Sequence, residues 1–226
     1  MNTVTRSEVW ELAKSRKDEL IGLVSRLIQI PSENPTGSQR EVIDFVEQYL
    51  TDAGIVWEEV SCNPAHPNVL AKMGSDEGFS VILNGHVDVV PAGDRAQWKW
   101  DPFGGEITDT QILGRGTSDM KAGVAGLLFA MKVIKDSGAK LKGNIRLHIV
   151  SDEESGSEYG TNWLCAQGYA KDADAVIIAE PTSNWTIESG QKGGLHVIFK
   201  AIGCSAHGSL GNYKGDNAIL KLEAQK

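Results

Sequence analysis

The chain has 226 residues, of which 41% are hydrophobic and 23% are charged, the usual balance of a globular protein. Its net charge of −8 and pI of about 5.2 argue against nucleic acid or an anionic membrane as a partner, because both require clustered lysine and arginine. No apolar run approaches the ~18 residues of a membrane span, and the N-terminus is too charged for a signal peptide, so we expect a cytoplasmic protein.

The first part of the chain predicts two helices followed by strands. Apolar residues recur at helical spacing over 7–30 and again over 38–53. Pro31 ends the first helix, and the segment PSENPTG that begins there has the composition of a loop. Runs of strand-forming residues then predict strands near 56–61, 68–72 and 79–83.

Helices and strands alternate through the middle of the chain. The aromatic and glycine-rich segment 95–123 is expected to form the wall of a cleft. The elements expected around it are a helix over 120–135, a buried strand over 144–150, a helix over 158–167 and a short buried strand over 175–179. This alternation predicts an α/β fold, with a mixed, mostly parallel sheet layered by helices. From Asn184 the pattern changes to two strands, 186–189 and 195–202, and a helix begins near Gly215.

Polar side chains follow the ends of three predicted strands and one glycine-rich turn. They are His86 and Asp88 after 79–83, Glu153 and Glu154 after 144–150, Glu180 after 175–179, and Asp119 after the turn. If the strands are parallel neighbours, these ends meet at one edge of the sheet. One imidazole and several carboxylates suit zinc or another divalent first-row metal, and Asp88 can hold the imidazole of His86 in the right tautomer.

The adjacent pair Glu153 and Glu154 has two interpretations. Because neighbouring side chains diverge, one carboxylate can bind a metal while the other accepts a proton from water beside the substrate. Alternatively, both belong to an acidic loop that caps the helix starting near Glu158. The recurrence of polar residues after strand ends and glycine turns favours the metal interpretation.

Other chemistries find little support in the sequence. There is no G-x-S-x-G elbow, no phosphate-binding G-x-x-x-x-G-K-[ST] loop, no G-x-G-x-x-G after a strand and no H-E-x-x-H. A Mg²⁺-dependent phosphohydrolase using the same carboxylates is disfavoured by His86 and by the missing phosphate loop. Three cysteines, Cys62, Cys165 and Cys204, form no CxxC pair and are expected to be buried or inert thiols.

Four motifs occur in one order along the chain: GHVDVVPAGD, the W-x-W-x-PF segment ending in GRGTSDMKAG, SDEESGS, and AEPT. In order and spacing they resemble the zinc amidohydrolases that include acetylornithine deacetylase, succinyl-diaminopimelate desuccinylase, aminoacylase and glutamate carboxypeptidase. The resemblance implies a metal-dependent hydrolase that cleaves the amide bond of N-acyl amino acids or small peptides. AEPT favours the deacetylase and desuccinylase branch.

The resemblance also implies a role for each site residue. His86 and Glu180 bind one zinc ion, Glu154 binds a second, and Asp119 bridges the two, with cobalt or manganese as substitutes. Asp88 orients His86, and Glu153 acts as the general base. The peptide bond after Asp119 is expected to be cis.

The segment SAHGSLGNYKGDNAI resembles the start of the family's smaller lid domain. There His207 matches the histidine that polarises the scissile carbonyl, in some members from the partner subunit, and Asn217 is a candidate helix cap. We therefore expect 1–182 to be the N-terminal portion of a catalytic domain and 183–226 to begin an α+β lid, through which a homodimer forms.

Length is the main departure from the family. Its members are nearly twice as long, and after the lid they supply a final histidine to the second zinc. His148 and His196 lie in predicted strands and do not match that ligand. The alternative hypothesis is therefore an inactive, truncated fragment or pseudoenzyme that acts as a non-catalytic interaction module.

Overall fold

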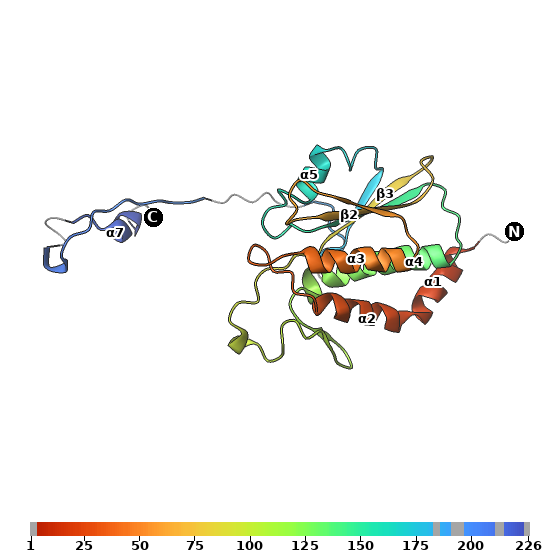
Figure 1. Ribbon diagram of the computed structural model, residues 1–226, viewed down its shortest axis with the longest axis horizontal. Helices are drawn as coiled ribbons and strands as arrows, with labels where there is room; N and C mark the ends of the chain where they lie inside the picture. The colour runs from red at the N-terminus through yellow and green to blue at the C-terminus, as the bar shows by residue number, and fades with distance from the viewer. Residues whose placement is uncertain (1–3, 183–185, 191–196, 211–214, 224–226) are drawn as a thin grey trace. The chain divides into compact units, whose positions relative to one another are not determined.

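A five-stranded mixed sheet forms the centre of the N-terminal part of the chain (Figure 1). The structure is a computed structural model that describes residues 4–182, 186–190, 197–210 and 215–223. The strand order is β1-β2-β6-β3-β7, with β1 Trp57–Val60, β2 Asn68–Gly74, β6 Asn144–Val150, β3 Ser80–His86 and β7 Ala175–Ile178. Strand β2 is antiparallel to β1 and β6, whereas β3 is parallel to both β6 and β7. The expected mixed α/β sheet is confirmed.

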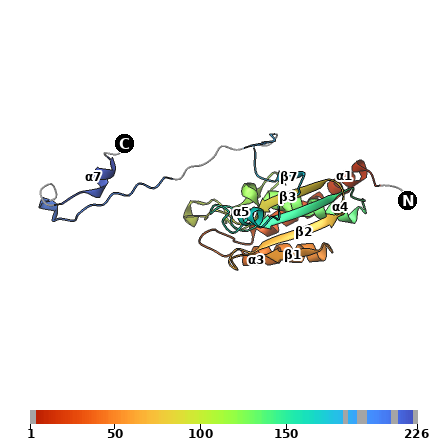
Figure 2. The same ribbon diagram turned by 90° about the horizontal axis from the view of Figure 1, so that it is seen from above.

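Helices cover the two faces of this sheet unequally (Figures 1 and 2). Helices α3 (Arg40–Asp52) and α4 (Ala122–Asp136) lie along one face with α2 (Lys17–Ile28) beside α4, and the short α5 (Thr161–Ala166) lies on the other face. Alternate strand residues point toward the three-helix side, where they form the main core with the apolar stripes of the helices. Its fully buried members include Leu27, Ile28, Val42, Ile43, Val46, Leu50, Val69, Val124, Leu128, Met131, Leu147 and Ile149.

The single helix predicted over 7–30 is in fact two helices, α1 (Arg6–Ser15) and α2, separated at Arg16. After Val9, helical spacing calls for an apolar residue near position 16, where the chain has arginine. The Arg16 guanidinium instead pairs with Glu19 at 2.6 Å and with Asp136 of α4 at 2.7 Å. The helix is therefore interrupted at Arg16, where a charged side chain takes the place of an apolar one.

Strand β3 does not end at Leu83, as the sequence predicts, but continues to His86. A Cβ added at Gly85 would lie 3.1 Å from side-chain atoms of both Met120 and Val124. This glycine therefore allows close packing against the start of α4 and does not interrupt the strand. As a result, His86 is held by the sheet itself.

Strand β7 is an edge strand, not the buried strand that the sequence predicts. Within the described residues no strand pairs with its outer edge. Its residues Val176, Ile177 and Ile178 are 53%, 54% and 57% exposed. A run of apolar residues is thus not enough to predict burial, because burial also requires a second neighbour in the sheet.

Residues 185–226 form a second compact unit. Over 186–189 and 197–202, the described parts of the two expected strands, the chain is not in strand conformation, and the connecting residues 191–196 lie outside the described residues. Ile187 and Ile198 are 96% and 92% exposed, so these stretches lack the packing that stabilises a strand. The assignment of 183–226 to a lid domain stays a prediction.

Two local predictions can be compared with the structure directly. The short helix α7 (Ala218–Glu223) begins after Asn217, whose side-chain oxygen accepts the main-chain N–H groups of Ile219 and Leu220, so the expected cap is confirmed. The expectation that the cysteines are buried is wrong, because all three are free and exposed: Cys62, Cys165 and Cys204. That they are inert stays a prediction. No helix in the described ranges has the length and apolar character needed to cross a membrane.

Candidate metal centre

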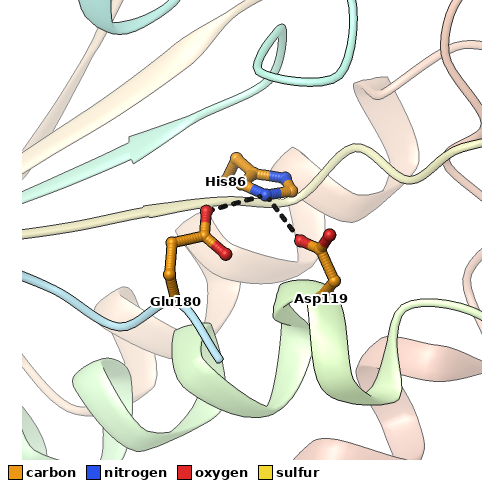
Figure 3. A group of neighbouring side chains, drawn as sticks. All are labelled: His86, Asp119 and Glu180. Carbon is orange, nitrogen blue, oxygen red and sulfur yellow. Dashed lines mark hydrogen bonds and ion pairs between the residues drawn. The ribbon is translucent and has the colours of Figure 1, made fainter. Parts of the chain in front are cut away.

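Three side chains from different elements converge at the carboxyl edge of the sheet (Figure 3). His86 is the last residue of β3, Asp119 lies in the turn η2 (Thr117–Lys121) before α4, and Glu180 lies two residues beyond β7. The Nε2 atom of His86 is 3.1 Å from Asp119 Oδ1 and 3.2 Å from Glu180 Oε1. One ligand atom from each residue lies within 4.8 Å of the others, a separation that one divalent cation can bridge.

The turn η2 presents Asp119 to this cluster. Gly116 precedes the turn with a left-handed φ of 81°, and Asp119 leaves the helical conformation at φ −117° and ψ 106°. The Asp119–Met120 peptide bond is cis, as predicted. Lys121 is fully buried and donates hydrogen bonds to the main-chain oxygens of Leu27 and Ile30, which tie the turn to the end of α2. Its burial lowers the pKa of Lys121 to about 7.

The imidazole of His86 has one preferred orientation. Its Nδ1 lies 2.9 Å from the main-chain oxygen of Asp88 and 3.4 Å from the Asp88 carboxylate. Since a carbonyl oxygen only accepts hydrogen bonds, Nδ1 carries a proton and Nε2 faces Asp119 and Glu180. The sequence predicts that Asp88 orients this ring, but the nearer partner is its main chain.

The charge around His86 favours a cation. Burial on its own lowers the pKa of His86, but the hydrogen bonds to Asp88 and Glu180 outweigh burial and raise this pKa to about 11. The Asp88 carboxylate faces Nδ1, whereas Glu180 and Asp119 place negative charge beside Nε2. An imidazole beside carboxylates from two other elements is a donor set that fits a divalent metal ion.

Asp88 is buried, and besides contacting His86 it holds the turn of Glu153 and Glu154, a role that the sequence does not indicate. Its carboxylate accepts the main-chain N–H groups of Glu153 at 3.1 Å and Glu154 at 3.0 Å, so it also shapes the turn that carries both glutamates. It further accepts a hydrogen bond from the side-chain amide of Asn34 at 2.9 Å. Although burial opposes the change, hydrogen bonds from His86 and Asn34 lower the pKa of Asp88, and it stays ionised.

The two adjacent glutamates lie differently. Glu153 Oε2 is 3.8 Å from His86 Nε2, and its side chain is 47% exposed. Partial burial raises the pKa of Glu153, and the charge of Glu180 adds to this while that of His86 opposes it. Glu154 accepts the main-chain N–H of Val90 at 3.3 Å, and burial raises its pKa too. The structure thus brings Glu153 beside the cluster and leaves Glu154 at its margin.

The remaining predicted site residue, His207, belongs to the second unit. It is exposed, and its Nδ1 lies 2.8 Å from the hydroxyl of Ser209. Its role toward a substrate stays a prediction.

Sequence reasoning did not single out three buried polar residues of this region: Asn34, Lys121 and Asp152. Asn34 and Lys121 follow no predicted strand. Asp152 does follow one, just after 144–150, but only its neighbours Glu153 and Glu154 are predicted to act at the site. The only available signal is a polar residue beside a motif, which is weak because most such residues face solvent.

The sequence profile of Peptidase family M20/M25/M40 matches residues 82–207, more than half of the chain. This range begins in β3 and includes every predicted site residue, from His86 to His207. The fold and the cluster define an α/β protein with a candidate metal centre, and the profile adds the identity. The chain belongs to this family.

Individual relatives are identical to the chain at about a third of the aligned positions. It is 35% identical over 206 residues to the probable succinyl-diaminopimelate desuccinylase of Staphylococcus epidermidis, a match that covers 90% of this chain and 49% of the relative. It is 37% identical over 193 residues to the N-formyl-4-amino-5-aminomethyl-2-methylpyrimidine deformylase of Bacillus subtilis, covering 82% and 44%. The chain therefore spans about half the length of the curated relatives it matches.

A solved structure agrees with the fold. The M20 family metallo-carboxypeptidase from Sulfolobus solfataricus is similar with a TM-score of 0.64 and 27% identity, over 72% of this chain and 37% of that protein. Membership of a family that contains metallopeptidases implies a divalent metal, and His86, Asp119 and Glu180 form a group that can hold one.

Proposed function

We propose that this chain carries the metal-binding part of a zinc-dependent amidohydrolase that acts on N-acyl amino acids or small peptides. The observation that carries the proposal is the convergence of His86, Asp119 and Glu180 at the carboxyl edge of the sheet. The relatives named as a desuccinylase and a deformylase support a substrate with an acyl group on nitrogen.

The ligands divide between two zinc ions. His86 and Glu180 would hold the first, Asp119 would bridge, and Glu154 would hold the second, with cobalt or manganese as substitutes. The three carboxylates would offset most of the charge of two divalent ions, so no large net charge would be buried. For Glu154 this role requires its carboxylate to exchange the Val90 N–H for the metal.

The chain's own residues supply the proton transfers. A bound zinc ion would polarise the amide carbonyl and lower the pKa of water. Glu153, whose pKa is raised beside the cluster, accepts a proton from the attacking water and delivers it to the nitrogen of the leaving amine. Asp88 keeps His86 oriented, and His207 donates a hydrogen bond to the oxygen of the scissile carbonyl.

Metal stoichiometry tests the proposal. Elemental analysis after dialysis against zinc is expected to find zinc in the purified chain, less of it in Glu180→Ala and Glu154→Ala, and an unchanged amount in Glu158→Ala. Glu158 is the matched control, because it is an exposed glutamate in the same acidic run. A wild-type chain that retains no zinc contradicts the proposal.

Turnover separates the enzyme from the alternative function. The proposal expects the zinc-loaded protein to release amine from N-succinyl, N-formyl or N-acetyl amino acids, or from dipeptides, and Glu153→Gln to lose this activity while keeping its zinc. Zinc binding with no turnover of any of these substrates favours the non-catalytic interaction module.

A further inference from the structure

We propose that Asn34 is a positioning residue of the metal centre. Its side-chain amide joins two buried carboxylates, Asp88 and Asp152, and thereby holds Asp88 in the orientation that His86 requires. The inference rests on the proposed function, because it concerns how the chain arranges its metal ligands before a metal binds.

Asn34 lies in the loop between α2 and α3 and is only 3% exposed. Its Nδ2 is 2.9 Å from Asp88 Oδ2 and 3.1 Å from Asp152 Oδ1. The two hydrogens of an amide NH₂ group can be donated one to each carboxylate. The main-chain N–H of Asn34 also donates to the oxygen of Val89 at 2.9 Å, which anchors the residue beside the segment that follows β3.

The two carboxylates need such a donor. Asp88 is 0% exposed and Asp152 is 2% exposed, and buried carboxylates need hydrogen-bond donors from the protein because little water reaches them. The outer oxygen of Asp152 already accepts the main-chain N–H of Tyr159 at 2.9 Å. Asn34 supplies a donor to both carboxylates at once, so it links them and satisfies one oxygen of each.

Removing the Asn34 amide is expected to change the positions of the candidate ligands indirectly, because Asp88 contacts both Asn34 and these ligands. One Asp88 oxygen faces the Nδ1 of His86, and the two oxygens accept the N–H groups of Glu153 and Glu154. A carboxylate that turns away from Asp152 therefore disturbs the glutamate turn and loses its contact with the imidazole, which then keeps only the hydrogen bond to the Asp88 main chain. Residues that orient a metal ligand in this way typically contribute 10–100-fold to metal affinity.

Cobalt binding tests the inference, since Co²⁺ reports its ligand geometry through visible absorption. We expect Asn34→Ala to weaken Co²⁺ binding to the purified chain by about tenfold or more and to alter the absorption band. Asn34→Ser keeps one donor and is expected to be intermediate. It also provides a milder variant for the comparison if Asn34→Ala does not fold.

Asn144→Ala is the matched control. Asn144 is 6% exposed and makes two side-chain hydrogen bonds, to Ser75 and Ser80, at the opposite end of β6. The Asn144→Ala substitution is expected to lower the melting temperature and to leave Co²⁺ affinity unchanged.

Three results overturn the inference. Asn34 variants with wild-type affinity and absorption show that the amide does not position the ligands. Equal weakening by Asn144→Ala shows that only stability is involved. A wild-type chain that binds no Co²⁺ removes the proposed metal centre itself, and the positioning role with it.

Discussion

A methyl group added at Gly123 is expected to displace Glu180 from the candidate metal centre. Gly123 lies in the first turn of α4, and a Cβ there would be 2.2 Å from the main-chain oxygen of Ala179, the residue before Glu180. Ordinary van der Waals contact begins at 3.4 Å, so one of the two backbone segments must move by about 1 Å. A displacement of about 1 Å in an active site can lower the rate by about a hundredfold.

The assay compares Gly123→Ala with Gly126→Ala by zinc titration against a competing fluorescent chelator. A Cβ at Gly126 meets nothing within 4 Å, so alanine there is expected to stabilise the helix by about 0.5–1 kcal/mol and to leave zinc affinity unchanged. Gly123→Ala is expected to weaken zinc binding by about 10–100-fold. Wild-type affinity in Gly123→Ala would refute the reasoning, because Glu180 would then either not bind the metal or not depend on this packing.

Three further predictions concern stability. Burial and the charge of Arg146 lower the pKa of His148 from 6.5 to about 4, so only the unfolded chain gains this proton as the pH falls below 6.5. Stability is therefore expected to drop by up to about 3 kcal/mol by pH 4 in urea unfolding, and His148→Leu to lack this part of the loss. Zinc at 100 times its Kd is expected to stabilise the chain by about 2.7 kcal/mol, and a chelator to remove that gain, as measured by thermal unfolding. Thr5→Ala, which breaks the capping box with Glu8, is expected to cost about 1 kcal/mol in the same assay.

Each of these has a contradicting result. Parallel pH curves for the wild type and His148→Leu would show that the native state protonates this histidine freely. A melting temperature indifferent to zinc and chelator argues against a metal site in the folded chain. Unchanged stability in Thr5→Ala would mean that the first turn of α1 is already open in solution.

Local patterns in the sequence determined most elements and the candidates for the site. The strand predicted over 144–150 coincides with β6, because its apolar residues and its flanking turns are both encoded within a few positions. The cap at Asn217 is equally local. The sequence identifies His86 and Glu180 because each lies at or just beyond the end of a run of strand-forming residues, and the motifs around them carry the family resemblance.

Other features were decided only by the tertiary structure, because they depend on partners far away in the chain. The register of β3 between β6 and β7 brings His86 to Glu180, and Lys121 reaches the end of α2. Asn34 donates hydrogen bonds to the carboxylates of Asp88 and Asp152, which lie 54 and 118 positions later in the chain. Periodicity and turn composition report which face of an element is apolar and where it ends. They do not report which distant polar atoms meet, since that depends on how the elements pack.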